Sequence, residues 1–261
     1  LMERYSGCGE DEDAVSMALS VIICVVRKRG LDARQLGMVQ MGSSSILDRS
    51  KSMKSEMMKP LEALGLGDVE AVDSVEGGAR LLLNATGWAS SQAWDGRWVL
   101  GVCVDTAEVP LGTTVPAAAG AVAVLIGPAA PLRVQMQASW RLPQAAFHHF
   151  MKPVGWWTMA QIDSEPDLLG AAFECFSKGH RSLRDRSGLP AALFGATRNV
   201  HSTGSGPRCV LRALEHAAAG RMSSSVLRSR FASNVAPSLQ LAAQIGPLHT
   251  ASALVSLLSL L

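Results

Sequence analysis

The sequence predicts a layered α/β fold, in which helices cover the faces of a sheet. Three observations support this fold class. Apolar residues recur at helical spacing in several segments, short runs rich in β-branched residues lie between those segments, and hydrophobic residues make up 48% of the 261 residues against 18% charged residues. Strands that alternate with helices are typical of layered α/β folds. The same composition excludes an intrinsically disordered chain.

The first helix is expected over residues 12–28. The apolar residues that recur at helical spacing there are Val15, Ala18, Ile22 and Val25. Acidic residues at positions 11–13 suit the positive end of the helix dipole, and three basic residues followed by Gly30 are a typical stop signal. The segment is therefore predicted to be an amphipathic helix with one buried face.

Strands and helices then alternate as far as Asp105, and a further strand follows up to Ile126. The expected strands are residues 36–41, 69–75, 97–105 and 120–126, and the expected helices between them are residues 48–64 and 79–90. The last two strands are almost continuously hydrophobic, which is typical of strands that are covered on both faces. The pattern weakens after Pro131. We expect further helices at residues 166–178, at 210–219 and from about 239 to the end, and a loop over the Gly-, Ser- and Arg-rich residues 179–208.

Charge and cysteine content exclude several classes of protein. Lys and Arg total 24 against 22 Asp and Glu, so there is no electrostatic case for binding nucleic acid. No apolar run reaches the ~20 residues that a membrane-spanning helix needs. The N-terminal segment is acidic, unlike a secretory signal. Five cysteines at irregular spacing form neither a disulfide framework nor a zinc pattern, which favours reduced thiols and a cytoplasmic protein.

Few residues indicate chemistry by pattern alone. The adjacent pair His148 and His149 would point in different directions on a strand or helix, and no nearby acid or cysteine completes a metal site, so we expect no metal. Cys103 lies inside an apolar strand and is expected to be packed rather than reactive. The serines at 43–45 follow Gly42 but lack the glycine framing of a nucleophile elbow. The residues thus indicate an α/β protein without a self-evident active site.

Several blocks, in the same order along the chain, resemble the hydroxymethylglutaryl-CoA synthase family. Residues 36–53 read LGMVQMGSSSILDRSKSM, residues 93–110 read AWDGRWVLGVCVDTAEVP and residues 120–131 read GAVAVLIGPAAP. Residues 150–153, FMKP, resemble the family's Phe-Tyr-Lys-Pro, and residues 250–252, TAS, resemble its Thr-Ser-Ser stretch. The resemblance is specific up to about residue 153 and patchy afterwards, and a family chain is nearly twice as long.

The resemblance implies a thiolase-like αβαβα architecture that is incomplete, with its first half better kept than its second. Residues 1–158 would be the N-terminal thiolase-like half, without its first strand, and residues 159–261 a compressed remnant of the C-terminal half. The family condenses acetyl-CoA with acetoacetyl-CoA in the mevalonate pathway of isoprenoid biosynthesis. CoA thioesters would therefore be substrates, and no separate cofactor is implied. Thiolase-like halves pair, so the partner would be a second copy or a full-length paralogue.

The chain departs from the family where the resemblance would place the catalytic residues. The family's nucleophilic cysteine lies in Asn-Ala-Cys-Tyr-Gly-Gly, but residues 73–78 read DSVEGG, about three residues shorter, with Glu76 at the helix entrance. Ser44 stands where the family has its acid/base glutamate. The nearest match to the family's histidine is His201, in VHST. A carboxylate at a helix N-terminus is electrostatically favourable, so Glu76 is more simply read as a cap.

These departures predict an acyltransferase homologue that is deficient in catalysis, because losing nucleophile and base together removes most of the rate enhancement. Two alternatives stay open. The chain could be a non-catalytic interaction subunit that pairs with a complete paralogue, or it could be a degenerate gene product.

Overall fold

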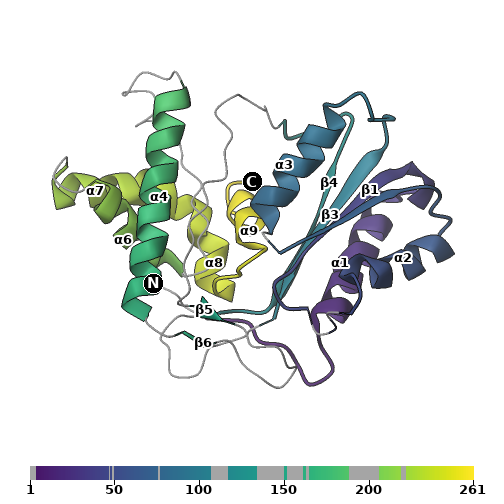
Figure 1. The fold of residues 1–261 in the computed structure, drawn as a ribbon, viewed down its shortest axis with the longest axis horizontal. Coiled ribbons are helices and arrows are strands. Elements are labelled where there is room, and N and C mark those ends of the chain that lie inside the picture. Colours follow the sequence, from purple (N-terminus) through teal and green to yellow (C-terminus); the bar gives the residue numbers. More distant parts are fainter. Residues whose placement is uncertain are drawn as a thin grey trace.

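A four-stranded sheet organises the first half of the molecule (Figure 1). The computed structural model describes residues 4–46, 48, 50–75, 77–106, 117–133, 150–151, 161–162, 165–187, 206–218 and 222–261. The strand order is β2 (Glu70–Ser74), β1 (Leu36–Gly42), β3 (Trp98–Asp105) and β4 (Gly120–Ile126). The first three strands are parallel and β4 is antiparallel to β3. The carboxyl ends of β1, β2 and β3 therefore meet at one edge of the sheet.

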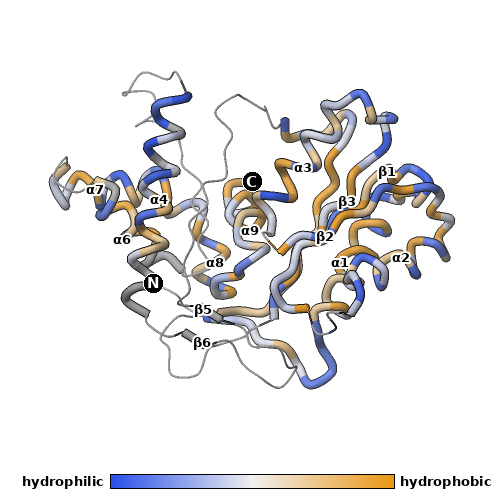
Figure 2. The backbone as a smooth tube through the Cα atoms, in the orientation of Figure 1, coloured by the Kyte–Doolittle hydropathy of each residue, from blue (hydrophilic) through white to orange (hydrophobic). Residues whose placement is uncertain are grey.

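Helices α1 (Ala14–Arg29) and α2 (Met53–Ala63) cover one face of this sheet. Helix α1 begins where the Asp13 carboxylate accepts the backbone N–H of Ser16 at 2.7 Å, and the Ser16 hydroxyl accepts that of Asp13 at 2.9 Å. It ends at Gly30, whose φ of 57° is in the left-handed region. A short 3-10 turn, Ala33–Gln35, leads into β1. Figure 2 shows apolar residues along α1 and the strands, as the periodicity predicts.

Helices α3 (Gly78–Ala89) and α9 (Ser252–Leu258) cover the opposite face. Their core brings Leu81 of α3 together with Leu254 of α9, although 173 residues separate them in the sequence. Gly101 in β3 permits this approach, because a Cβ there would lie only 2.5 Å from a methyl group of Leu81. The end of the chain thus packs on the sheet that the first half builds.

The remaining described elements form a helical layer beside α9 (Figure 1). They are α4 (Glu165–Ser187), α6 (Gly206–Ala217), α7 (Ser224–Arg230), a π-helical turn (Phe231–Val235), a 3-10 turn (Ala236–Leu239) and α8 (Gln240–Ile245). A small core that includes Val210, Val235 and Leu239 holds this layer together. Two short antiparallel strands, β5 (Phe150–Met151) and β6 (Gln161–Ile162), pair with each other. The described helices contain no segment long and apolar enough to cross a bilayer.

The structure corrects two expectations from the sequence and refines a third. The prediction of a loop from residue 179 is wrong over residues 179–187, which continue α4. The single helix expected from residue 239 is two helices, interrupted at Gly246, whose φ of 91° a helix does not tolerate. Strand β4 packs against the cores on both faces of the sheet, as its hydrophobicity predicts, but all seven of its residues stay partly exposed because it is an edge strand.

Candidate functional site

The candidate site lies where the carboxyl ends of β1, β2 and β3 meet the start of α3 and the turn before α9. In open α/β sheets this edge is where ligands usually bind. Polar groups, the backbone at the entrance to α3, the serine loop after β1 and a nearby thiol converge on it.

Asp105 is the buried acceptor on which the hydrogen bonds of this region converge. Its side chain is fully buried at the end of β3. One carboxylate oxygen accepts the backbone N–H of Thr250 at 3.0 Å and its hydroxyl at 2.7 Å, and the other accepts the N–H of Ala251 at 2.9 Å. These hydrogen bonds offset the cost of burying the carboxylate. These contacts tie the carboxyl end of β3 to a segment 145 residues later in the chain.

The entrance to α3 is packed against the same segment. The backbone N–H of Gly78 donates to the carbonyl oxygen of Thr250 at 2.6 Å. Gly77 has a φ of 73° and a ψ of −156°, a conformation that is essentially restricted to glycine. A Cβ at Gly77 would lie 2.4 Å from the Thr250 carbonyl oxygen. The chain itself therefore occupies the side of the helix entrance that faces Thr250.

The serine loop after β1 is held by backbone and hydroxyl hydrogen bonds. The N–H of Ser43 donates to the carbonyl oxygen of Ser74 at 3.1 Å, and the Ser43 hydroxyl accepts the N–H of Ser45 at 3.0 Å. The Ser45 hydroxyl accepts the N–H of Thr106 at 3.1 Å. Ser43 and Ser45 are buried, whereas Ser44 between them is exposed. The loop thus presents Ser44 to solvent and uses its two neighbours for structure.

Cys103 is the thiol nearest to this edge among the described residues. It is fully buried in β3, opposite Gly42 of β1, as the sequence predicts. Burial, together with the charge of Asp105, raises the pKa of the Cys103 thiol to about 12. At neutral pH the side chain is therefore a protonated thiol, which is a poor nucleophile.

The structure places only one of the three catalytic candidates from the sequence. Ser44 lies at the candidate site, whereas Glu76 and His201 fall outside the described residues, as do His148 and His149. In the part of the chain that the structure describes, no three His, Cys, Asp or Glu residues are grouped so as to hold a metal ion.

Sequence reasoning missed the contact between Asp105 and Thr250. An acid that ends a buried strand, and a threonine that precedes a helix, were the available signals. Neither signal shows that the two residues meet.

Comparison with known proteins identifies similar families and folds. A protein-family model described as "Hydroxymethylglutaryl-coenzyme A synthase N terminal" matches residues 2–131. Hydroxymethylglutaryl-CoA synthase of Mycosarcoma maydis is 33% identical over 208 residues, which are 78% of this chain and 44% of that protein. The mitochondrial hydroxymethylglutaryl-CoA synthase of Sus scrofa is 38% identical over 132 residues, 49% of this chain and 26% of that protein. The chain thus spans less than half the length of these two relatives.

Solved structures with the same fold cover nearly the whole chain. MvaS in complex with 3-hydroxy-3-methylglutaryl coenzyme A aligns with a TM-score of 0.78 and 22% identity, over 95% of this chain and 65% of that chain. The HMG synthase of the curacin biosynthetic pathway, in complex with acetyl donor-ACP, aligns with a TM-score of 0.81 and 21% identity, over 98% of this chain and 63% of that chain. These alignments identify the thiolase-like α/β fold.

Proposed function

This chain belongs to the hydroxymethylglutaryl-CoA synthase family through its N-terminal domain, and we propose that it is a member that has lost the condensation of acetyl-CoA with acetoacetyl-CoA. The observation that carries the proposal is the sequence at the entrance to α3. Where the family has Asn-Ala-Cys-Tyr-Gly-Gly, residues 73–78 read DSVEGG and contain no cysteine. Without that thiol there is no side chain in this segment to take the acetyl group as a thioester.

The neighbouring thiol does not compensate for the missing cysteine. Cys103 is fully buried, and its raised pKa keeps it protonated, whereas a catalytic cysteine needs a stabilised thiolate and access to substrate. The base is missing as well, since Ser44 stands at the position of the family's glutamate. An exposed serine hydroxyl does not accept a proton at neutral pH without a partner base. The cysteine would take up the acetyl group and the glutamate would act in the condensation that follows, so two successive steps each lose a catalytic group and we expect deficiency rather than a slower reaction.

The domain organisation that we propose follows from the same resemblance. Residues 1–158 would be the N-terminal thiolase-like half and residues 159–261 a shortened second half. The four-stranded sheet and its helices α1 to α3 support the first assignment, since all of them lie before residue 127. The packing of α9 onto α3 supports a second half that closes over the first.

Free cysteines in the described chain support a reducing compartment, which we propose to be the cytoplasm.

Acetyl-enzyme formation tests the proposal. The purified chain is incubated with acetyl-CoA, and its intact mass is measured, with the hydroxymethylglutaryl-CoA synthase of Mycosarcoma maydis as the positive control. We expect that relative to gain an acetyl group and this chain to remain unmodified. If this chain became acetylated, peptide mapping with Cys→Ala variants would locate the nucleophile, and the proposal would fall.

A second candidate function is that of a non-catalytic subunit that pairs with a complete paralogue. The four-stranded sheet and its two buried cores favour it, because they keep the N-terminal scaffold packed without needing the family's catalytic residues. Co-expression with a complete family member tests this candidate. A stable one-to-one complex would support it, and separate elution at micromolar concentration would count against it.

A further inference from the structure

Gln40 is a fully buried polar side chain in an inner strand of the sheet. It lies in β1, with Val72 of β2 on one side and Gly101 of β3 on the other. Neither the nitrogen nor the oxygen of its side-chain amide has a hydrogen-bond partner among the residues that the structure describes. A buried amide without partners is costly, so native proteins almost always pair such a group with protein atoms or with an ordered water.

The Gln40 side chain points towards α3. Successive side chains of a strand point to opposite faces of the sheet. Val39 and Met41, the neighbours of Gln40 in the sequence, belong to the core under α1 and α2. Met38 lies on the other face, where it packs with Ala85 of α3. The Gln40 amide is therefore directed into the interface between β1 and α3.

Two close approaches show how α3 lies over β1. A Cβ at Gly42 would be 3.3 Å from the Cα of Gly77, and one at Gly37 would be 2.8 Å from a ring carbon of Trp88. Helix α3 therefore runs along β1 in the direction opposite to the strand. From residue 77 to 88 the helix rises about 16 Å, and from residue 42 to 37 the strand spans about the same distance. Gln40 consequently lies beneath the part of α3 around residues 81–85.

Leu81 confirms this alignment of the two elements. A Cβ at Gly101, the residue opposite Gln40 in β3, would be 2.5 Å from a methyl group of Leu81. Leu81 thus fills the space over Gly101, beside the Gln40 side chain. Residues three apart are neighbours on the surface of a helix, so Asn84 lies next to Leu81. Asn84 is therefore the polar residue of α3 at the level of Gln40.

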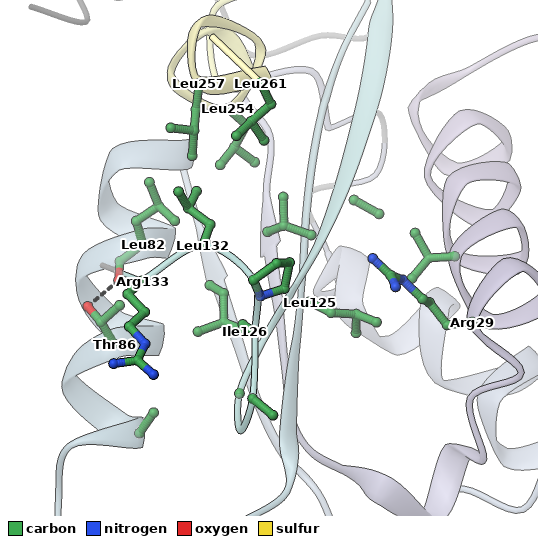
Figure 3. A pocket seen from close by; sticks show the side chains of 18 of the residues that line it. Arg29, Leu82, Thr86, Leu125, Ile126, Leu132, Arg133, Leu254, Leu257 and Leu261 are labelled. Atoms are coloured by element: carbon green, nitrogen blue, oxygen red, sulfur yellow. Dashed lines mark hydrogen bonds between the residues drawn. The ribbon is translucent and has the colours of Figure 1, made fainter. Parts of the chain in front are cut away.

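Asn84 points away from β4. Leu82 and Thr86 project from α3 into a groove beside Ile126 of β4 (Figure 3). Because each helical residue turns by about 100°, Asn84 is rotated by about 160° from both of them, towards the side of β1 and β2. Asn84 is only partly buried. Its amide can therefore reach the interface in which Gln40 lies.

We propose that the amides of Gln40 and Asn84 together hold one buried water molecule between β1 and α3. This site goes beyond the proposed function and does not depend on it. The two amides are not bonded to each other directly, since Gln40 has no described partner. A water molecule both donates and accepts, so it satisfies the oxygen of one amide and the nitrogen of the other. A metal cation would satisfy only the oxygen, and Leu81 leaves no space for a larger ligand.

A crystal structure of the full chain, at a resolution that shows ordered waters, tests the site. We expect one peak of electron density at about 2.7–3.2 Å from an atom of each amide. The Gln40→Met variant, which has a side chain of similar length without an amide, should lack this peak. A direct hydrogen bond between the two amides, or no density between them in the unmodified chain, overturns the proposal.

Urea denaturation distinguishes a hydrated amide from a bare one. If the Gln40 amide were bare, Gln40→Met would remove two unsatisfied groups and raise the urea midpoint. With the water in place, the variant loses satisfied hydrogen bonds, and we expect a midpoint that does not rise. Gln240→Met is the matched control, because Gln240 is exposed and its replacement should leave the midpoint unchanged. A higher midpoint for Gln40→Met, with no change in the control, would contradict the proposal.

A double-mutant cycle tests whether Asn84 shares the water with Gln40. The variants are Gln40→Met, Asn84→Leu and their combination, and the urea midpoint is measured for each. Either single change should remove the water, so the second change should have a smaller effect in the combined variant than it has alone. Strictly additive effects would mean that the two amides do not share a water, and the proposal would fall.

Discussion

At the scale of single residues, Asp105 ties the end of the chain to the sheet by hydrogen bonds. Three donors from Thr250 and Ala251 point at one buried carboxylate. Removing the carboxylate takes the acceptor from these buried donors, and a buried donor without a partner costs about 1–3 kcal/mol. A single side chain thus links the first and last parts of the described structure.

The variant Asp105→Ala should lower the free energy of unfolding by about 3 kcal/mol or more, measured by urea denaturation. Asp32→Ala serves as the control. Asp32 forms an exposed ion pair with Arg34 at 2.6 Å, so its loss should lower the free energy of unfolding far less than the loss of Asp105 does. Equal losses for the two variants would show that the buried contacts of Asp105 contribute little.

Cys103 should resist alkylation and make the fold sensitive to high pH. Its raised pKa leaves about one thiolate in ten thousand at pH 8, so iodoacetamide should label the exposed Cys24 and leave Cys103 unmodified, as read by peptide mass. The folded state holds the proton more tightly than the unfolded state. This contribution to stability is therefore complete below pH 9 and is lost as the pH rises towards 12. Labelling of both thiols at similar rates would contradict this account.

At the scale of elements, the start of α3 depends on the absence of a side chain at Gly77. Both its backbone conformation and its distance from the Thr250 carbonyl exclude a Cβ. Gly77→Ala should lower the free energy of unfolding by about 3 kcal/mol or more in urea denaturation. Gly30→Ala is the matched control. Gly30 also has a positive φ, but open space surrounds it, so about 1 kcal/mol is expected. Similar losses at the two positions would mean that the contact with Thr250 has little effect.

Most elements of the first half could be predicted from the sequence because local signals agree there. Helix α1 has an apolar face, a cap and a glycine stop, and β1 and β3 are buried as their composition indicates. The exposure of β4 could not be predicted, since a continuous apolar run does not reveal whether the strand is at an edge. The continuation of α4 through 179–187 was missed because the polar residues of an exposed helix resemble those of a loop.

At the scale of the whole molecule, the family scaffold is present, and the loss of the family's chemistry is what we propose. The sheet, its two covering layers and the join at Asp105 form a packed structure that aligns with solved relatives over 95–98% of the chain. The candidate site could be located from the sequence only through the resemblance, because Ser44 and residues 73–78 carry no catalytic pattern of their own. The sequence does not show that Ser44, Gly77 and Thr250 lie at the same end of the sheet. Their arrangement depends on contacts between segments that are far apart in the sequence.

The most direct test of the central claim is the intact mass of the purified chain after incubation with acetyl-CoA. Catalytic deficiency predicts a mass that does not change under conditions in which the Mycosarcoma maydis relative acquires an acetyl group. A stoichiometric acetyl adduct on this chain, discharged on addition of acetoacetyl-CoA, would contradict the claim that it has lost the condensation.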